Sequence, residues 1–139
     1  MPLSLKIIFV LFLMSIIYTI FSFRNIFSLS SYFFGFEFLG VQAFFVELVF
    51  TVILLGVFLF GLWNRKKWTF YYGVFYLVIM LLGGIASFAR IIFFNLPSEF
   101  VELSWKEVLV FSIVGTMPFL SFYLIILFLL IWNRKYFIR

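Results

Sequence analysis

Four stretches of this 139-residue chain are each long and apolar enough to cross a lipid bilayer. They cover residues 3–23, 41–63, 68–89 and 108–132, and about 20 apolar residues suffice to cross the hydrocarbon layer. Lipid cannot satisfy open backbone groups, and the stretches lack the alternating pattern of barrel strands, so each is predicted to be an α-helix. The sequence therefore predicts an all-α integral membrane protein, with residues 1–139 forming one bundle of four transmembrane helices.

The composition excludes a soluble domain and most kinds of catalytic centre. Hydrophobic residues make up 67% of the chain and charged residues 11%, whereas soluble proteins average about 45–50% and about 25%. The chain contains no Cys, His or Asp. It therefore lacks a thiol nucleophile, the usual zinc ligands and the members of a Ser–His–Asp triad. We expect no enzyme activity, no catalytic residue, no metal site and no cofactor.

The basic residues gather at the ends of the apolar stretches and not along one soluble face, which argues against nucleic acid as a partner. The positive-inside rule assigns the two main clusters to the cytoplasm. We therefore expect a multi-pass protein of the cell membrane with both termini in the cytoplasm. An anionic-lipid site is the alternative interpretation of the same residues. The clusters are Arg65, Lys66 and Lys67 in the second connection, and Arg134 and Lys135 after the fourth stretch.

A short motif occurs twice. The tetrapeptide Trp-Asn-Arg-Lys stands at residues 63–66 and again at residues 132–135, each time directly after an apolar stretch. The repetition predicts two tandem helical hairpins, residues 1–67 and 68–139. The alternative is that membrane interfaces favour Trp and basic residues at the end of every helix.

The two outer connections contain more than linker residues. Residues 24–40 are rich in Phe, and we expect them to lie in the interfacial layer or against a partner. Pro97 and Ser98 mark a helix start. The residues after Ser98 place charged side chains on one side of a helix and apolar ones on the other. A short amphipathic helix is therefore predicted before the fourth span.

Glu47 is the one acid inside the four stretches. At about 1.5 Å per residue it lies about 25 Å from the cytoplasmic end of its helix. A carboxylate at that depth is costly, so it should face protein, water or a cation. Arg90 ends the third stretch at about the same level, which predicts a Glu47–Arg90 ion pair. Thr51 follows Glu47 by one helical turn.

Further polar residues occupy the third and fourth stretches. Gly83 and Ser87 form a small-xxx-small pair that permits close helix approach. Pro118 removes a backbone donor and predicts a kink, and Thr116 stands beside it. With Glu47, these groups predict a small polar cavity that opens outward. The alternative is that they are packing faces, with the ion pair fixing helix register.

With so little chemistry available, we expect a non-catalytic accessory or structural subunit of a larger membrane complex. The expected partners are the lipid bilayer and either other membrane-protein subunits or further copies of the chain. A small homo-oligomeric transporter or channel that uses Glu47 is the first alternative. An intramembrane binder of a lipid-like ligand is the second.

Overall fold

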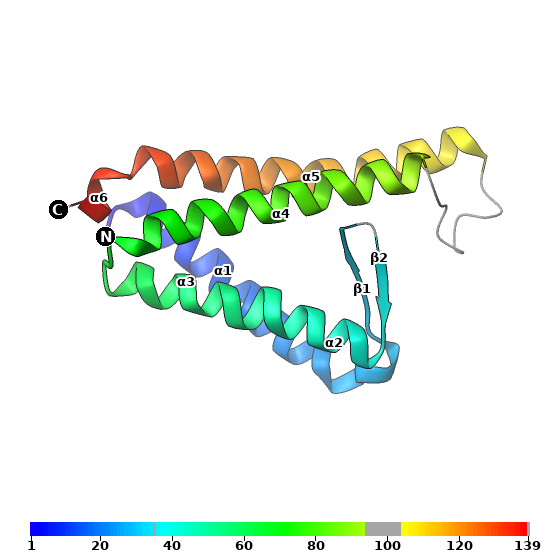
Figure 1. The fold of residues 1–139 in the computed structure, drawn as a ribbon, viewed down its shortest axis with the longest axis horizontal. Coiled ribbons are helices and arrows are strands. Elements are labelled where there is room, and N and C mark those ends of the chain that lie inside the picture. Colours follow the sequence, from blue (N-terminus) through cyan, green and yellow to red (C-terminus); the bar gives the residue numbers. More distant parts are fainter. Residues whose placement is uncertain (35, 94–103, 139) are drawn as a thin grey trace.

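The computed structural model describes residues 1–34, 36–93 and 104–138 of the chain, and most of these residues are helical (Figure 1). Four helices are long and apolar enough to cross a membrane, as predicted. The second is continuous but changes type, from α-helix to π-helix and back. In chain order the elements are α1 (Leu3–Ser22), the 3-10 helix η1 (Phe23–Ser28), β1 (Ser30–Phe33), β2 (Phe36–Leu39), α2 (Val41–Glu47), the π-helix η2 (Leu48–Ile53), α3 (Leu54–Trp63), α4 (Trp68–Phe93), α5 (Trp105–Trp132) and α6 (Lys135–Ile138).

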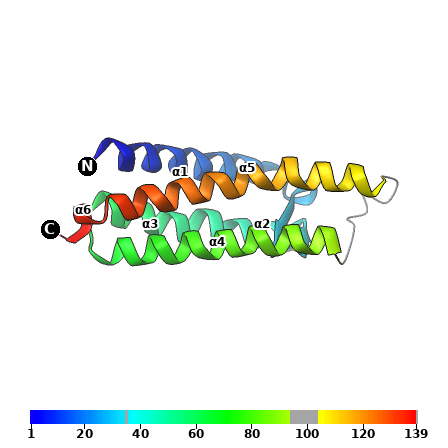
Figure 2. The ribbon, with the colours of Figure 1, turned by 90° about the horizontal axis from the view of Figure 1, so that it is seen from above.

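The long helices run side by side, and both termini lie at one end of the molecule (Figures 1 and 2). The turn between α3 and α4 lies at this same end, which we call the terminal end. α4 and α5 form the most extensive helix pair, and α3 packs against both α1 and α4. Toward the opposite end, α1 and α2 diverge from α4 and α5 (Figure 1).

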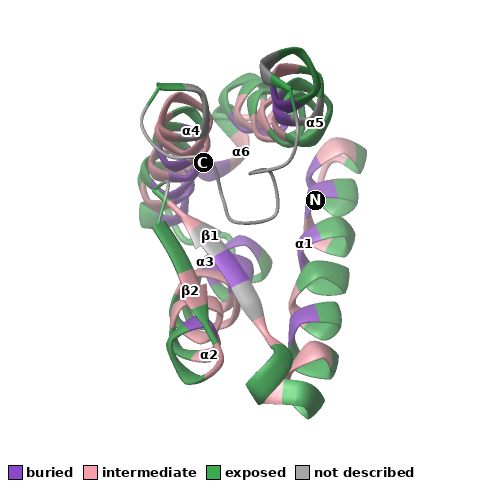
Figure 3. Cartoon of the chain, turned by 90° about the vertical axis from the view of Figure 1, so that its right-hand side faces the viewer, coloured by how far each residue is buried: buried purple, intermediate pink, exposed green. Residues whose placement is uncertain are grey.

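The hydrophobic core lies in the half of the molecule nearer the terminal end, where the helices are close together. Buried residues of every long helix contribute to this core (Figure 3). Phe137 of α6 is also fully buried, so the last turn closes this end of the bundle. The fully buried side chains of the core are Leu5, Ile8, Phe12, Leu55, Phe58, Leu62, Leu77, Leu130 and Phe137.

A β-hairpin stands between α2 and α4 where the helices diverge (Figures 1 and 3). Its strands are antiparallel, with Ser31 opposite Phe38 and Phe33 opposite Phe36. At its tip the Phe34 ring packs against Gly83 of α4. Residues 24–40 were expected to lie at the interface or against a partner, but here their hairpin packs against the chain's own helices. Aromatic residues suit strands, which explains the local structure.

α5 begins at Trp105, three residues before the predicted fourth span. Ser104 and Glu107 form a capping box, in which each side chain bonds the backbone N–H of the other residue. The amphipathic helix predicted from Ser98 falls largely on residues 94–103, outside the described residues. Pro118 lies within α5, which continues as one helix on both sides of it. The bend predicted at Pro118 stays a prediction.

The repeated tetrapeptide folds in the same way at its asparagines. The side-chain amide of Asn64 donates to the carbonyl of Phe60 at 2.9 Å, and that of Asn133 donates to Leu129 at 2.7 Å. The copies then differ, because Arg65 of the first has a positive φ of 53°, whereas α6 begins at Lys135, the last residue of the second. Since a shared tetrapeptide can explain a shared helix cap, the hairpin repeat stays a prediction.

Candidate functional site

The half-buried carboxylate of Glu47, at the end of α2, accepts hydrogen bonds from two neutral hydroxyl groups. Ser31 of β1 donates to Oε1 at 2.8 Å, and Thr51 of η2 donates to Oε2 at 2.9 Å. Thr51 lies one turn beyond Glu47, which is the spacing seen in the sequence. Ser31 is buried, and only the hairpin brings it here. Both carboxylate oxygens are therefore held in place, one from the same helix and one from a strand.

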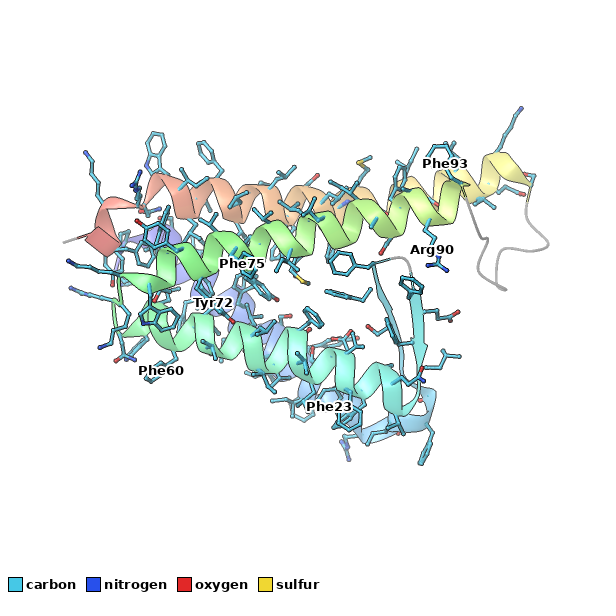
Figure 4. All side chains as sticks on the ribbon, in the orientation of Figure 1. Phe23, Phe60, Tyr72, Phe75, Arg90 and Phe93 are labelled. Atoms are coloured by element: carbon cyan, nitrogen blue, oxygen red, sulfur yellow. The ribbon has the colours of Figure 1, made fainter. Side chains whose placement is uncertain are left out.

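Arg90 has a different neighbour from the one the sequence predicted. Its guanidinium lies over the ring of Phe36, 4.0 Å from the ring centroid, and extends from α4 toward the hairpin (Figure 4). Among the described residues, Glu47 and Arg90 form no ion pair. The physical reason is the intervening hairpin, whose Ser31 bonds Glu47 while its Phe36 lies beneath Arg90.

The helix widens into the π-helix η2 directly after Glu47, and two tyrosines of α4 bond to this region. The hydroxyl of Tyr76 donates to the carbonyl of Phe50 at 3.1 Å, and that of Tyr72 donates to Leu54 at 2.8 Å. A carbonyl oxygen has two lone pairs, so it can accept these additional bonds. Short π-helical segments often occur at functional sites. In this chain the two tyrosine hydrogen bonds hold η2 and the start of α3 against α4, directly after Glu47.

Aromatic side chains pack next to the segments that hold the carboxylate group. The rings of Phe33 and Phe50 lie 4.0 Å apart between centroids, which places the hairpin against η2. Tyr76 of α4 and Tyr123 of α5 lie close enough to interact with the charge of Glu47. The site thus combines one acid, several hydroxyls and aromatic rings from four parts of the chain. Such a site can accept a proton or bind a cation.

The other predicted residues are spread over the two neighbouring helices. Ser87 is half-buried on α4, the helix that also carries Arg90. On α5, Thr116 is half-buried and Pro118 is exposed. Within the described part of the chain, no hydrogen bond joins Thr116 to Glu47. The structure therefore brings Thr51 to Glu47 but gives neither Arg90 nor Thr116 a direct bond to it.

The predicted basic clusters lie together at the terminal end. Arg65 of the α3–α4 turn stacks over Tyr136 at 5.3 Å, and Arg134 stacks over Phe70 at 5.8 Å. Arg65 thus lies against a ring from the second half of the chain, whereas Arg134 and Phe70 both belong to that second half. The exposed basic residues of the two clusters are Arg65, Lys66, Lys67, Arg134 and Lys135.

Sequence reasoning missed Ser31 and did not assign roles to Tyr72 and Tyr123. Short runs that contain Tyr or Phe stand on either side of Gly35, and such aromatic residues are enriched in strands, which is the signal that could have suggested a hairpin at Ser31. A tyrosine in an apolar helix needs a hydrogen-bond partner for its hydroxyl, which could have directed attention to both tyrosines. Comparison with known proteins adds no family, because no protein-family model, no curated protein and no solved structure matches this chain.

Proposed function

We propose that the chain is a multi-pass membrane protein that binds a cation at Glu47, and that it works as a small homo-oligomeric transporter of protons or organic cations. One observation carries the proposal. Two neutral hydroxyls hold the carboxylate of Glu47, and among the described residues it has no basic partner. It belongs to a helix apolar enough to span a membrane.

The physical argument starts from the cost of an acid in lipid. An ionised side chain at the centre of a membrane helix costs about 2.5–3.5 kcal/mol on insertion scales, and Glu47, in the outer half of its span, bears part of that cost. A proton or a cationic ligand removes that cost by neutralising the charge. A carboxylate offers about four acceptor positions, and the hydroxyls of Ser31 and Thr51 occupy two of them. The remaining positions are free for a proton or an ammonium group.

The surrounding rings favour an organic cation over a divalent metal. Phe33 follows Ser31 by two residues and Phe50 follows Glu47 by three, and their rings lie against each other near the carboxylate; cations are attracted to aromatic rings. A divalent metal prefers six or more oxygen ligands, several of them from acids. The described residues contain no cluster of three His, Cys, Asp or Glu side chains.

The proposed orientation puts both termini in the cytoplasm of a cell. It is supported by the terminal end, where both termini lie with the two basic clusters (Figure 1), because basic residues accumulate on the cytoplasmic side. Counted at about 1.5 Å per residue from Asn64, Glu47 then lies in the outer half of the bilayer. A ligand would reach it from outside the cell or from the outer leaflet.

An accessory subunit of a larger membrane complex is the second candidate, and α5 favours it. Only 11% of its most apolar 18-residue window is buried within the chain, against 33% for α4. A Cβ added at the exposed Gly115 would meet no other atom within 4 Å, so another helix could approach closely there. This candidate predicts that the abundance of the chain in membranes depends on a partner.

Transport in reconstituted liposomes tests the first proposal. We would impose a pH gradient and measure uptake of tetraphenylphosphonium, a lipophilic cation, by wild-type protein and by Glu47→Gln. Glu37→Gln is the matched control, because Glu37 is an exposed acid on β2 of the hairpin that bonds Glu47. We expect Glu47→Gln to abolish uptake and Glu37→Gln to retain it.

Equal uptake by Glu47→Gln and wild-type protein would refute a role for this carboxylate. Extraction from native membranes in mild detergent, followed by native electrophoresis and mass spectrometry, separates the two candidates. A small homo-oligomer agrees with the transporter. A large assembly with stoichiometric unrelated subunits would instead support the accessory role.

A further inference from the structure

We propose that the terminal end of the bundle holds the phosphate of an anionic phospholipid, with Arg65 as its principal ligand. Two hollows adjoin Arg65 and Tyr136, with volumes of about 490 Å³ and about 450 Å³. Lys6, Phe9 and Trp63 also line the first, and Lys135 also lines the second. Each hollow thus contains two basic side chains and at least two aromatic ones.

The charge of this end suits an anionic ligand. The acids among the described residues, on β2, on α2 and at the start of α5, belong to the opposite half of the molecule (Figure 1). The terminal end therefore has an uncompensated positive charge, and a phosphate group complements it. Its described basic residues are Lys6, Arg65, Lys66, Lys67, Arg134 and Lys135.

The backbone of Arg65 is the most specific observation. α3 ends in a Schellman turn, in which Lys66 N–H bonds Gly61 at 3.0 Å and Arg65 N–H bonds Leu62 at 3.4 Å. In such turns the residue after the helix cap adopts a left-handed conformation and is usually Gly. In this chain that residue is Arg65, with a φ of 53°. Non-glycine residues in this conformation cluster at ligand sites. The turn and the ring of Tyr136 together fix the guanidinium between the two hollows.

The first hollow also has an apolar wall for the rest of a lipid. The rings of Phe9 of α1 and Trp63 of α3 lie 5.6 Å apart, and Trp63 remains 68% exposed. Val10 continues the exposed apolar surface along α1. Trp residues favour the headgroup level of a membrane. A phosphate beside Lys6 and Arg65 would therefore leave the acyl chains lying along α1 and α3.

A lipid competition experiment tests this proposal. Purified full-length protein would receive equal amounts of dioleoyl phosphatidylglycerol and dioleoyl phosphatidylcholine, and native mass spectrometry would count the lipids retained. We would compare Arg65→Gln with Lys67→Gln, which removes the same charge from the same turn but from a residue that lines neither hollow. We expect phosphatidylglycerol to be preferred, and Arg65→Gln to weaken its retention about fivefold, while Lys67→Gln has little effect.

Other results would overturn the proposal. Equal losses in Arg65→Gln and Lys67→Gln would reveal only general attraction to a basic surface, and an absence of headgroup preference in wild-type protein would exclude the site. Displacement of the lipid by inorganic phosphate at comparable concentration would assign the site to a free anion. If Arg65→Gln fails to fold, as judged by circular dichroism, Lys6→Gln on the exposed side of α1 replaces it with the same expectation.

Discussion

Gly73 of α4 lies where three helices meet, so enlarging it tests the packing of the bundle directly. A Cβ at this position would overlap the ring of Phe58 from α3 and lie 2.9 Å from Leu130 Cδ2 of α5. Both neighbours are buried, at 1% and 0% exposure, and the ring of Phe12 supports Phe58 from behind, with centroids 5.9 Å apart. Neither side chain can move away without displacing another part of the core.

The expected magnitude follows from two opposing effects. Replacing Gly by Ala inside a helix gains about 1 kcal/mol from backbone propensity, while overpacking a tight core costs about 1–3 kcal/mol. Gly56→Ala in α3 provides the matched control, because a Cβ there would meet no atom within 4 Å. The difference between the two variants therefore isolates the packing cost. We predict that Gly73→Ala is less stable than Gly56→Ala by about 1–3 kcal/mol.

The assay is equilibrium unfolding in detergent micelles. Sodium dodecyl sulfate would be titrated into each variant, and far-ultraviolet circular dichroism would follow the loss of helix and yield the free energy of unfolding. Equal stability of the two alanine variants would refute the reasoning, because α3, α4 and α5 could not then be packed closely at Gly73.

Three further substitutions remove side-chain hydrogen bonds, one each in Ser31→Ala and Tyr72→Phe and two in Asn133→Ala, which also loses its bond to Leu129. Ser31→Ala removes a hydrogen-bond donor to the Glu47 carboxylate and should lower the free energy of unfolding by about 1.5–3 kcal/mol, measured by the same titration. Wild-type stability of this variant would mean that Ser31 does not hold the hairpin against Glu47. Tyr72→Phe loses the hydrogen bond to α3 and should lower the free energy of unfolding by about 0.5–1.5 kcal/mol. The control is Tyr71→Phe at an exposed position, and a similar loss of stability in this control would contradict the role of the Tyr72 bond. Asn133→Ala separates the end of α5 from α1 and should speed proteolysis near the C-terminus; unchanged cleavage would count against this link.

The four helices could be predicted because length and apolar composition alone define them. The second span was predicted over residues 41–63 and is observed as Val41–Trp63, since Gly40 precedes it and the basic turn follows it. The proximity of Thr51 to Glu47 follows from helical spacing, so the sequence sufficed for that part of the site. It did not reveal the π-helix η2, which follows Glu47 and contains Thr51. A π-turn has no recognised residue pattern and depends on tertiary contacts such as those of Tyr72 and Tyr76.

The contacts of Arg90 could not be predicted by counting residues along helices. A depth estimate places Glu47 and Arg90 at similar levels, but it says nothing of what lies between two helices. Here residues Ser30–Phe33 and Phe36–Leu39 form a hairpin in that space. Because four of these eight residues are aromatic, they suit a membrane interface and a packed strand equally well. Long-range packing, which spacing does not encode, decided between these two outcomes.

Binding of a cation by the purified protein tests the central claim most directly. Equilibrium dialysis of radiolabelled tetraphenylphosphonium against detergent-solubilised protein would compare wild-type protein, Glu47→Gln and the control Glu37→Gln. We predict saturable binding that Glu47→Gln abolishes and that Glu37→Gln retains. Binding by Glu47→Gln with wild-type affinity would contradict the assignment of Glu47 as the cation ligand.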